Sequence, residues 1–200
     1  MTGPAFFRPL ALLAAMREIP GWLEDDEAEL LIAGAAYVTR SAGSRTLVEI
    51  GSYQGRSTVV IAGTLRALSP GSRLFAIDPH EGTVGAEDAR LTRGTSTFER
   101  FIAHIEKAGV SSCVRPLRAL SYETDWIGPI DLLFVDGLHD RLNVERDFRH
   151  FEPFLTDDAV VLFHDYADYY PGVRDFVDEL TRNGWRVGAG AGSMRLLQRD

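Results

Sequence analysis

Short β-branched runs alternate with segments of helical periodicity from Thr46 onward, and this alternation restricts the fold of the 200-residue chain more than any other feature. It is typical of parallel strands joined by crossover helices. The pattern therefore predicts an α/β fold with a mostly parallel sheet and helices on both faces. The expected strands are 46–50, 73–78, 113–117, 130–136 and 159–164, and the expected helices lie near 56–68, 96–108, 141–152 and 172–182.

The first 40 residues precede this pattern and read as two helices. Pro20 and Gly21 separate the two helices, because both residues interrupt helical periodicity. The second helix is expected to begin with Asp26 and Glu29, which have the spacing of a capping box. We expect this region to form a helical cap that covers the substrate or pairs with a second copy of the chain, so that a homodimer is one prediction.

The last segments of the chain predict an antiparallel hairpin. Apolar stretches at 185–188 and 194–198 flank a glycine-rich segment, which is suited to a tight turn. With these two, the expected sheet has seven strands. The length and the 45% hydrophobic content fit a single domain over 1–200, with the helical cap at 1–40 and a ligand-binding core at 41–200.

The composition excludes several classes of partner. A formal charge of −8 and a pI near 5.1 argue against nucleic acid, which is bound by clustered Lys and Arg. No run approaches 18 apolar residues, so no membrane span is expected, and the apolar stretch within residues 1–16 reads as an amphipathic helix. Cys113 is the single cysteine and cannot form an internal disulfide, so a cytoplasmic location is expected.

An acid and two glycines stand where the first expected strand turns into a helix. Gly51 and Gly55 leave the backbone bare, so that a ligand can approach it closely. Asp78 ends the next strand, where an acid can accept the hydroxyls of a ribose. The glycine spacing is not that of a pyrophosphate-binding GxGxxG loop, and Glu49 would repel a pyrophosphate. A carboxylate at this place suits a cationic nucleoside-like ligand.

Polar side chains follow two further apolar runs at the points where these strands end. Asp136 and His139 follow one run, and His164 and Asp165 follow the other. Ligands of open α/β sheets bind at the carboxyl ends of the strands, so these groups are expected to converge on one crevice. Carboxylate oxygen and imidazole nitrogen suit Mg²⁺, Mn²⁺ or a similar ion. We therefore expect Asp136, His164 and Asp165 to be metal ligands, with magnesium as the expected ion.

The chain resembles class I S-adenosylmethionine-dependent methyltransferases over nearly its whole length. The segments that carry the resemblance are Glu49-x-Gly51-x-x-x-Gly55, Asp78 and Val135-Asp-Gly-Leu-His139. More narrowly, it resembles the small metal-dependent sugar O-methyltransferases related to macrocin-type enzymes, including those acting on methylmannose polysaccharides. That narrower likeness lies in Ile19-Pro-Gly-Trp-Leu23, Glu49 to Thr58, Asp136-Gly-x-His139 and Phe163-His-Asp-Tyr166.

The resemblance implies a Rossmann-like methyltransferase fold that binds S-adenosylmethionine. In such a family Glu49 and Gly51 face the methionine portion, Asp78 binds the ribose, and Leu120 and Ser121 contact adenine. Taken singly, Glu49 could instead form a salt bridge and Asp78 could cap a helix or turn. The expected cofactor-binding residues are Glu49, Gly51, Tyr53, Gly55, Ser57, Asp78, Leu120, Ser121 and Asp136.

The expected reaction needs help at the acceptor, because an aliphatic hydroxyl is nearly as weak an acid as water. The water pKa of about 15.7 falls to about 7 on a strongly polarising metal such as zinc, and magnesium polarises less. A general base is therefore expected, and His139 is placed to accept the proton. His139 could instead cap the helix that starts near Arg141. Related sugar enzymes usually have two acids after the fifth strand, so His164 could bind metal, contact substrate or donate to a backbone carbonyl.

The acceptor is expected to be a sugar or oligosaccharide. Tyr166, Tyr169 and Tyr170 follow the metal-binding strand and could border a sugar, or could simply pack on the next helix. Residues 80–95 form a long segment that is either a lid over the site or an ordinary surface loop. His104 and His150 need no role, and Asp147 is expected to be an exposed or capping acid.

Three alternatives remain open at this point. A catechol-type O-methyltransferase uses the same cofactor and metal, but Asp-Asn would be expected after the fifth strand. An NAD-dependent dehydrogenase shares the strand-turn-helix arrangement, but Glu49 and the absence of GxGxxG argue against it. A non-catalytic protein that binds the cofactor or a sugar is the third alternative, against which Asp136, His139 and Asp165 argue.

Overall fold

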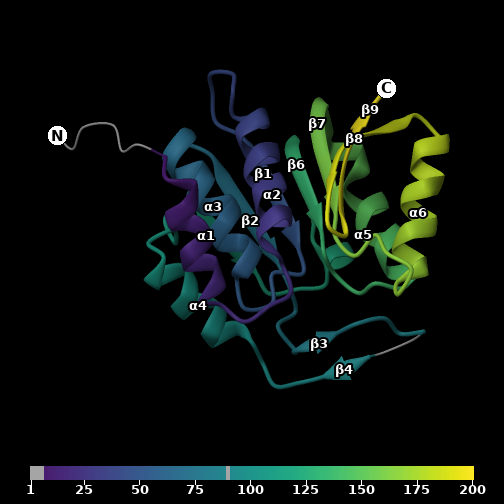
Figure 1. The fold of residues 1–200 in the computed structure, drawn as a ribbon, viewed down its shortest axis with the longest axis horizontal. Helices are drawn as coiled ribbons and strands as arrows, with labels where there is room; N and C mark the ends of the chain where they lie inside the picture. Colours follow the sequence, from purple (N-terminus) through teal and green to yellow (C-terminus); the bar gives the residue numbers. More distant parts are fainter. Residues whose placement is uncertain (1–6, 89–90) are drawn as a thin grey trace.

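The computed structural model describes residues 7–88 and 91–200, and it is an α/β sandwich (Figure 1). Helices cover both faces of one central sheet, as the sequence predicts. In the described residues the sheet has seven strands in the order β5-β2-β1-β6-β7-β9-β8. Their bounds are β1 Thr46–Ile50, β2 Arg73–Ile77, β5 Val114–Leu117, β6 Ile130–Val135, β7 Leu155–Phe163, β8 Trp185–Ala191 and β9 Met194–Arg199.

The first five of these strands in spatial order are parallel, and the C-terminal hairpin extends the sheet. β9 runs antiparallel to β7 and pairs with β8, which lies at the edge. This confirms the predicted hairpin, although its turn is shorter than expected. The glycine-rich segment up to Ala191 belongs to β8, and the connection to β9 is made by Gly192 and Ser193.

Two apolar cores lie on the two faces of the sheet. Alternate residues of the strands supply them: Leu132 and Phe134 of β6 enter one core, whereas Leu133 and Val135 enter the other. The first core also takes side chains from α1 Pro9–Arg17, α2 Asp25–Val38, α3 Arg56–Leu68 and α4 Phe98–Lys107. The second takes side chains from α5 Arg141–Phe151 and α6 Pro171–Arg182. Single 3₁₀ turns are formed by Ser121–Glu123 and Glu152–Phe154.

The N-terminal helices belong to the same core as α3, against which both of them pack. α2 begins two residues earlier than expected, with a capping box between Glu24 and Glu27 in place of Asp26 and Glu29. This correction matters because it turns the Glu27 side chain back toward the start of the helix. Residues 1–6 of the predicted cap lie outside the described residues. No helix in the described part of the chain has both the length and the apolar character needed to cross a membrane.

The segment 80–95 forms a small hairpin apart from the main sheet (Figure 1). Its two short strands are β3 Thr83–Val84 and β4 Thr92–Arg93, and residues 89–90 between them lie outside the described residues. Two hydrogen bonds of the hairpin main chain join it to the loop after β6. The His139 amide donates to the Gly85 carbonyl at 2.9 Å, and the Glu87 amide donates to Asp140 Oδ2 at 3.2 Å.

Candidate active site

A cavity of about 1090 Å³ opens at the carboxyl ends of β1, β2, β6 and β7. The chain moves outward from β1 to β2 and β5 on one side and from β6 to β7 on the other, so the cavity lies at the point where the strand order reverses. Open α/β sheets bind ligands at this point. The predicted residues that line the cavity are Gly51, Tyr53, Asp78, Leu120, Ser121, Asp136, His139, His164 and Asp165.

Gly51 is required by the close approach of two loops at the floor of the cavity. Its φ is +86°, and a Cβ at this position would overlap the backbone carbonyl oxygen of Asp136. Its amide donates to the Ile77 carbonyl at 2.9 Å. The predicted backbone without a Cβ is present, and it allows the loop after β1 to pack closely on the loop after β6. Gly55 has a φ of +92° and begins α3 without reaching the cavity lining.

Asp78 holds the loops on either side of it and also faces the cavity. Its Oδ2 accepts from the Tyr53 amide at 2.7 Å, and its Oδ1 accepts from the His80 amide at 2.6 Å. The capping role considered from the sequence is therefore present. A carboxylate oxygen can accept more than one hydrogen bond, so these contacts leave Asp78 able to bind hydroxyl groups in the cavity. Trp22 packs against Tyr53 at the same wall, with ring centroids 5.3 Å apart and a tilt of 43° between the ring planes.

Glu49 departs from its predicted position. Its side chain is fully buried, lies outside the described cavity lining, and accepts hydrogen bonds of 2.5 Å from Ser57 Oγ and Thr58 Oγ1. Burial raises the pKa of Glu49 to about 8, although the two hydroxyls favour the charged form. The carboxyl group is thus mostly protonated at neutral pH, and Glu49 and Ser57 form a layer behind the cavity wall.

The cavity has a polar corner where the loop after β5 meets α5. Ser121 is buried there, and its hydroxyl donates to Oδ1 of Asp147, which is 6% exposed. The expectation that Asp147 is exposed or caps a helix is wrong. Asp140 caps α5 instead, accepting from the Asn143 amide at 3.1 Å, so the capping alternative considered for His139 is also wrong. Burial raises the pKa of Asp147 to about 6, against the hydrogen bond from Ser121.

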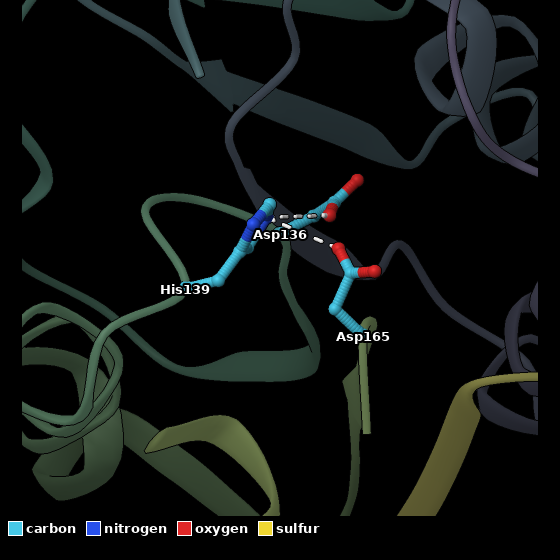
Figure 2. A group of neighbouring side chains, drawn as sticks. All are labelled: Asp136, His139 and Asp165. Carbon is cyan, nitrogen blue, oxygen red and sulfur yellow. Dashed lines mark ion pairs between the residues drawn. The ribbon is translucent and has the colours of Figure 1, made fainter. Parts of the chain in front are cut away.

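Asp136, His139 and Asp165 converge at the ends of β6 and β7. Figure 2 shows their side chains pointing toward one another, with the imidazole facing both carboxylates. His139 Nε2 lies 3.1 Å from Asp165 Oδ2 and 3.9 Å from Asp136 Oδ1. One ligand atom from each residue falls within 4.8 Å of the other two, which is compact enough to hold a metal ion. Asp165 has a φ of +61°, a strained conformation for a residue with a side chain.

His164 stands behind this cluster with both ring nitrogens engaged by carboxylates. Its Nδ1 lies 3.0 Å from Asp165 Oδ2 and 3.2 Å from Asp136 Oδ1, and its Nε2 lies 2.9 Å from Glu27 Oε2. Burial alone would lower the pKa of His164, but these three acids raise it well above its ordinary value. The side chain is therefore an imidazolium. The compact group that could hold a metal ion contains His139 beside Asp136 and Asp165, and His164 lies behind it. The assignment of His164 as a ligand stays a prediction.

Glu27 was missed by the sequence analysis. It lies in the first turn of α2 and is buried, yet it lines the cavity. Its Oε1 accepts from the amide and the hydroxyl of Ser193, each at 2.8 Å, while Oε2 pairs with His164. Burial is the largest single effect and opposes ionisation of Glu27. The hydrogen bond and charge of His164, with the hydrogen bonds from the Glu24 amide and Ser193, together outweigh it and lower the pKa of Glu27 to about 2. Glu27 thus joins an N-terminal helix and the C-terminal hairpin to the site.

The three tyrosines after β7 separate into two groups. Tyr169 and Tyr170 line the cavity, and the ring of Tyr170 lies 4.3 Å from that of His139. Tyr166 turns away and donates to Asp178 of α6 at 2.8 Å. Two aromatic faces therefore border the cavity beside the acid cluster, and the third tyrosine packs on the following helix as the alternative interpretation predicted.

A sequence model of a protein family described as "Methyltransferase domain" matches residues 48–166. These 119 residues are more than half of the chain and contain the strand ends that form the cavity.

Similar proteins are known by sequence and by structure. The uncharacterized protein y4gI of Sinorhizobium fredii is 30% identical over 122 residues, which are 60% of this chain and 13% of y4gI. This chain therefore spans a small part of that relative's length. The O-methyltransferase TomG of Streptomyces achromogenes, solved with SAM, has a TM-score of 0.63 and 21% identity over 96% of this chain and 88% of TomG. CalS11, a TDP-rhamnose 3′-O-methyltransferase, has a TM-score of 0.61 and 17% identity over 95% and 92% of the two chains.

Proposed function

This chain belongs to the methyltransferase domain family, and on that premise we propose that it transfers a methyl group from S-adenosylmethionine to a hydroxyl oxygen. The observation that carries the proposal is that one continuous cavity contains both groups of residues. It runs from Asp78, which suits a ribose, to the cluster of Asp136, His139 and Asp165, and its volume of about 1090 Å³ leaves room for a cofactor and an acceptor together. TomG, which shares the fold, was solved with SAM. Family membership removes the dehydrogenase alternative.

The cofactor position that we propose follows from the residues that line this cavity. Asp78 accepts hydrogen bonds from the ribose hydroxyls, and Leu120 and Ser121 contact the adenine ring. Gly51, Tyr53 and Asp136 border the methionine portion. We assign to Asp136 the attraction for the sulfonium that the sequence suggested for Glu49, because Glu49 is mostly protonated at neutral pH. Glu49, Gly55 and Ser57 support this surface from behind.

A divalent ion fits the cluster of Asp136, His139 and Asp165. The donor set of two carboxylates and one imidazole suits Mn²⁺ or Zn²⁺ at least as well as the Mg²⁺ expected from the sequence. His139 Nε2 faces this cluster, while Nδ1 is buried without a hydrogen-bond partner among the described residues. When bound, such an ion would lower the pKa of an acceptor hydroxyl and fix its position.

The two roles considered for His139 exclude each other, since a nitrogen that holds a metal ion cannot accept a proton. The geometry favours the ligand role, because Nε2 is the atom that faces both carboxylates and Nδ1 is buried. The general-base role predicted from the sequence remains the alternative. Loss of a ligand would raise the metal concentration needed for half-maximal activity, whereas loss of a base would lower kcat at saturating metal.

The acceptor that we propose is a sugar hydroxyl. Tyr169 and Tyr170 offer aromatic faces beside the acid cluster, and such faces pack against the apolar faces of sugars. CalS11, which has the same fold, is a TDP-rhamnose 3′-O-methyltransferase. The residues after β7 are His164 and Asp165 in place of the Asp-Asn expected for a catechol-type enzyme, so a catechol is the second acceptor to test.

Labelled S-adenosylmethionine, incubated with the protein and either nucleotide sugars, free saccharides or catechols, tests the proposal. We expect transfer to a sugar, and its loss with EDTA and recovery with Mn²⁺ or Mg²⁺. Asp165→Asn should abolish the response to metal, and His104→Gln, a histidine outside the cavity lining, serves as the control. Cofactor binding without transfer to any acceptor would indicate a non-catalytic binder. The predicted homodimer is a separate proposal, tested by mass measurement in solution.

A further inference from the structure

Asp147 is a buried acid on the face of α5 that packs against the sheet. Its neighbours on this face are Val144, Phe148 and Phe151, all of which are buried in the second core. A carboxylate is costly in such surroundings unless something binds it. Asp147 nevertheless reaches the cavity and forms part of its lining.

One oxygen of Asp147 is satisfied and the other is open. Oδ1 accepts from the Ser121 hydroxyl, whereas no described residue donates a hydrogen bond to Oδ2. Arg146, the nearest cation in sequence, points to Asn143 and stacks on the ring of Tyr122 at 3.5 Å. The main chain of Gly137 passes so close to Oδ2 that a Cβ on this residue would come within 2.7 Å of it. Because this residue is a glycine, no Cβ stands against the oxygen.

The position of this oxygen relates it to the base of a nucleoside. With the ribose on Asp78 at the end of β2, the reacting group must point toward Asp136 and Asp165 at the ends of β6 and β7. The base then extends the other way, toward the loop after β5 that contains Leu120 and Ser121. Asp147 lies at this end of the cavity, beside Ser121.

We propose that Asp147 determines the specificity for adenine, by accepting a hydrogen bond at Oδ2 from the exocyclic amino group of the base. This inference rests on the proposed function. An ionised carboxylate can only accept, so it pairs with an amino group. It opposes the keto oxygen that hypoxanthine carries at the same position, and it is left unpaired by a purine without a substituent there. Discrimination by a buried polar group arises mainly from the cost of leaving that group unpaired.

Calorimetric titration of the full chain with three product analogues tests this assignment. The ligands are S-adenosylhomocysteine, its inosine counterpart and the counterpart that lacks the 6-amino group. Loss of a hydrogen bond to a charged group corresponds to roughly 10- to 100-fold in affinity. We expect both altered ligands to bind wild-type protein more weakly than S-adenosylhomocysteine by about this factor.

The variant Asp147→Leu removes the acceptor and introduces an apolar side chain of similar size. This variant is expected to bind S-adenosylhomocysteine more weakly than wild type and to bring the affinities for the three ligands within about threefold of one another. Asp131→Leu, a buried acid at the opposite end of β6, is the matched control and should keep the wild-type ratios. If Asp147 had a structural role alone, its substitution would weaken the binding of all three ligands by the same factor.

Several results would overturn the inference. Equal affinities for the three ligands in wild-type protein would do so without any variant, which keeps the test valid where Asp147→Leu fails to fold. Unchanged ratios in a folded Asp147→Leu protein would also reject the assignment while leaving the proposed function intact. Failure of wild-type protein to bind any of the three ligands would instead reject the proposed function, and this inference with it.

Discussion

Glu49→Gln is expected to make the ligand-free protein more stable at neutral and alkaline pH. The Glu49 carboxyl is fully buried beneath the cavity wall, between the hydroxyls of Ser57 and Thr58. Burial favours its protonated form and raises its pKa from an ordinary 4.5 to about 8. An amide has nearly the same shape as this protonated carboxyl and carries no ionisable proton, so the substitution removes the titration and little else.

The sign and size of the effect follow from proton linkage. Between pH 4.5 and about 8 the folded protein keeps a proton on Glu49 that the unfolded chain has lost. The contribution of Glu49 to the free energy of unfolding is therefore complete below pH 4.5 and falls by about 1.4 kcal/mol per pH unit above it. The variant should nearly equal the wild type near pH 4.5, exceed it by about 3 kcal/mol at pH 7 and by about 4 kcal/mol at pH 8, where the folded carboxyl is half ionised.

Urea denaturation of both proteins at pH 5, 6, 7 and 8 measures this difference directly, because other titrating groups are common to both and cancel. Glu106→Gln on an exposed part of α4 controls for the removal of an acid as such. Since Glu49 is mostly neutral at pH 7, we also expect Glu49→Gln to bind S-adenosylhomocysteine within about threefold of wild type, less than the effect of one hydrogen bond to a charged group.

A stability difference that stays constant from pH 5 to pH 8 would refute this reasoning. It would mean that Glu49 is ionised in the folded protein, despite its burial. In that case Glu49→Gln should also weaken cofactor binding strongly, as the sequence motif suggested. The attraction for the sulfonium that we assign to Asp136 would then come from Glu49.

Three further predictions concern single side chains. Gly51→Ala is expected to lower stability by at least about 2 kcal/mol more than Gly184→Ala; the two glycines have φ values of +86° and +88°, but only at Gly51 would a Cβ overlap a backbone carbonyl, and equal thermal shifts would contradict this. Glu27→Gln is expected to lower the pKa of His164, because it removes a carboxylate that raises it; an unmoved NMR titration of the imidazole protons would exclude the pairing. Tyr169→Ala is expected to raise KM for a sugar acceptor by about 2- to 10-fold with little change in kcat, and an unchanged KM would place the sugar elsewhere.

Most of the fold was predictable because burial leaves a periodic pattern in the sequence. The expected parallel strands agree with the structure to within one residue at each end, except at the start of β7, which begins at Leu155 and not at Ala159. Polar residues at 156–158 hide this beginning, and the pairing with β6 shifts register there. β8 was recognised only at its first residues. It is an exposed edge strand whose glycines pair through the backbone, so it needs no apolar pattern.

The two acids that the sequence analysis missed or misplaced both lie on apolar helix faces. Glu27 precedes Leu31 by one turn of α2, and Asp147 follows Val144 by one turn of α5. Their helical spacing from these apolar residues is a sign of burial that the sequence analysis did not use, and a buried acid needs a partner. The partners could not be predicted, because Glu27 meets His164 137 residues away and Asp147 meets Ser121 26 residues away. An acid on an apolar stripe was the available signal.

The contrast between His139 and His164 shows how one distant residue decides the chemistry of this site. Each histidine lies at a strand end beside an aspartate, so the sequence could not assign their roles. Glu27 distinguishes them, because it pairs with the second nitrogen of His164 and, with Asp136 and Asp165, raises the pKa of that side chain, whereas Nε2 of His139 faces the cluster. One imidazolium against the carboxylates of Glu27 and Asp165 leaves the site negative, even though burial raises the pKa of Asp136. This residual negative charge favours the binding of both a sulfonium cofactor and a divalent ion. Removal of Glu27 would therefore weaken the binding of both.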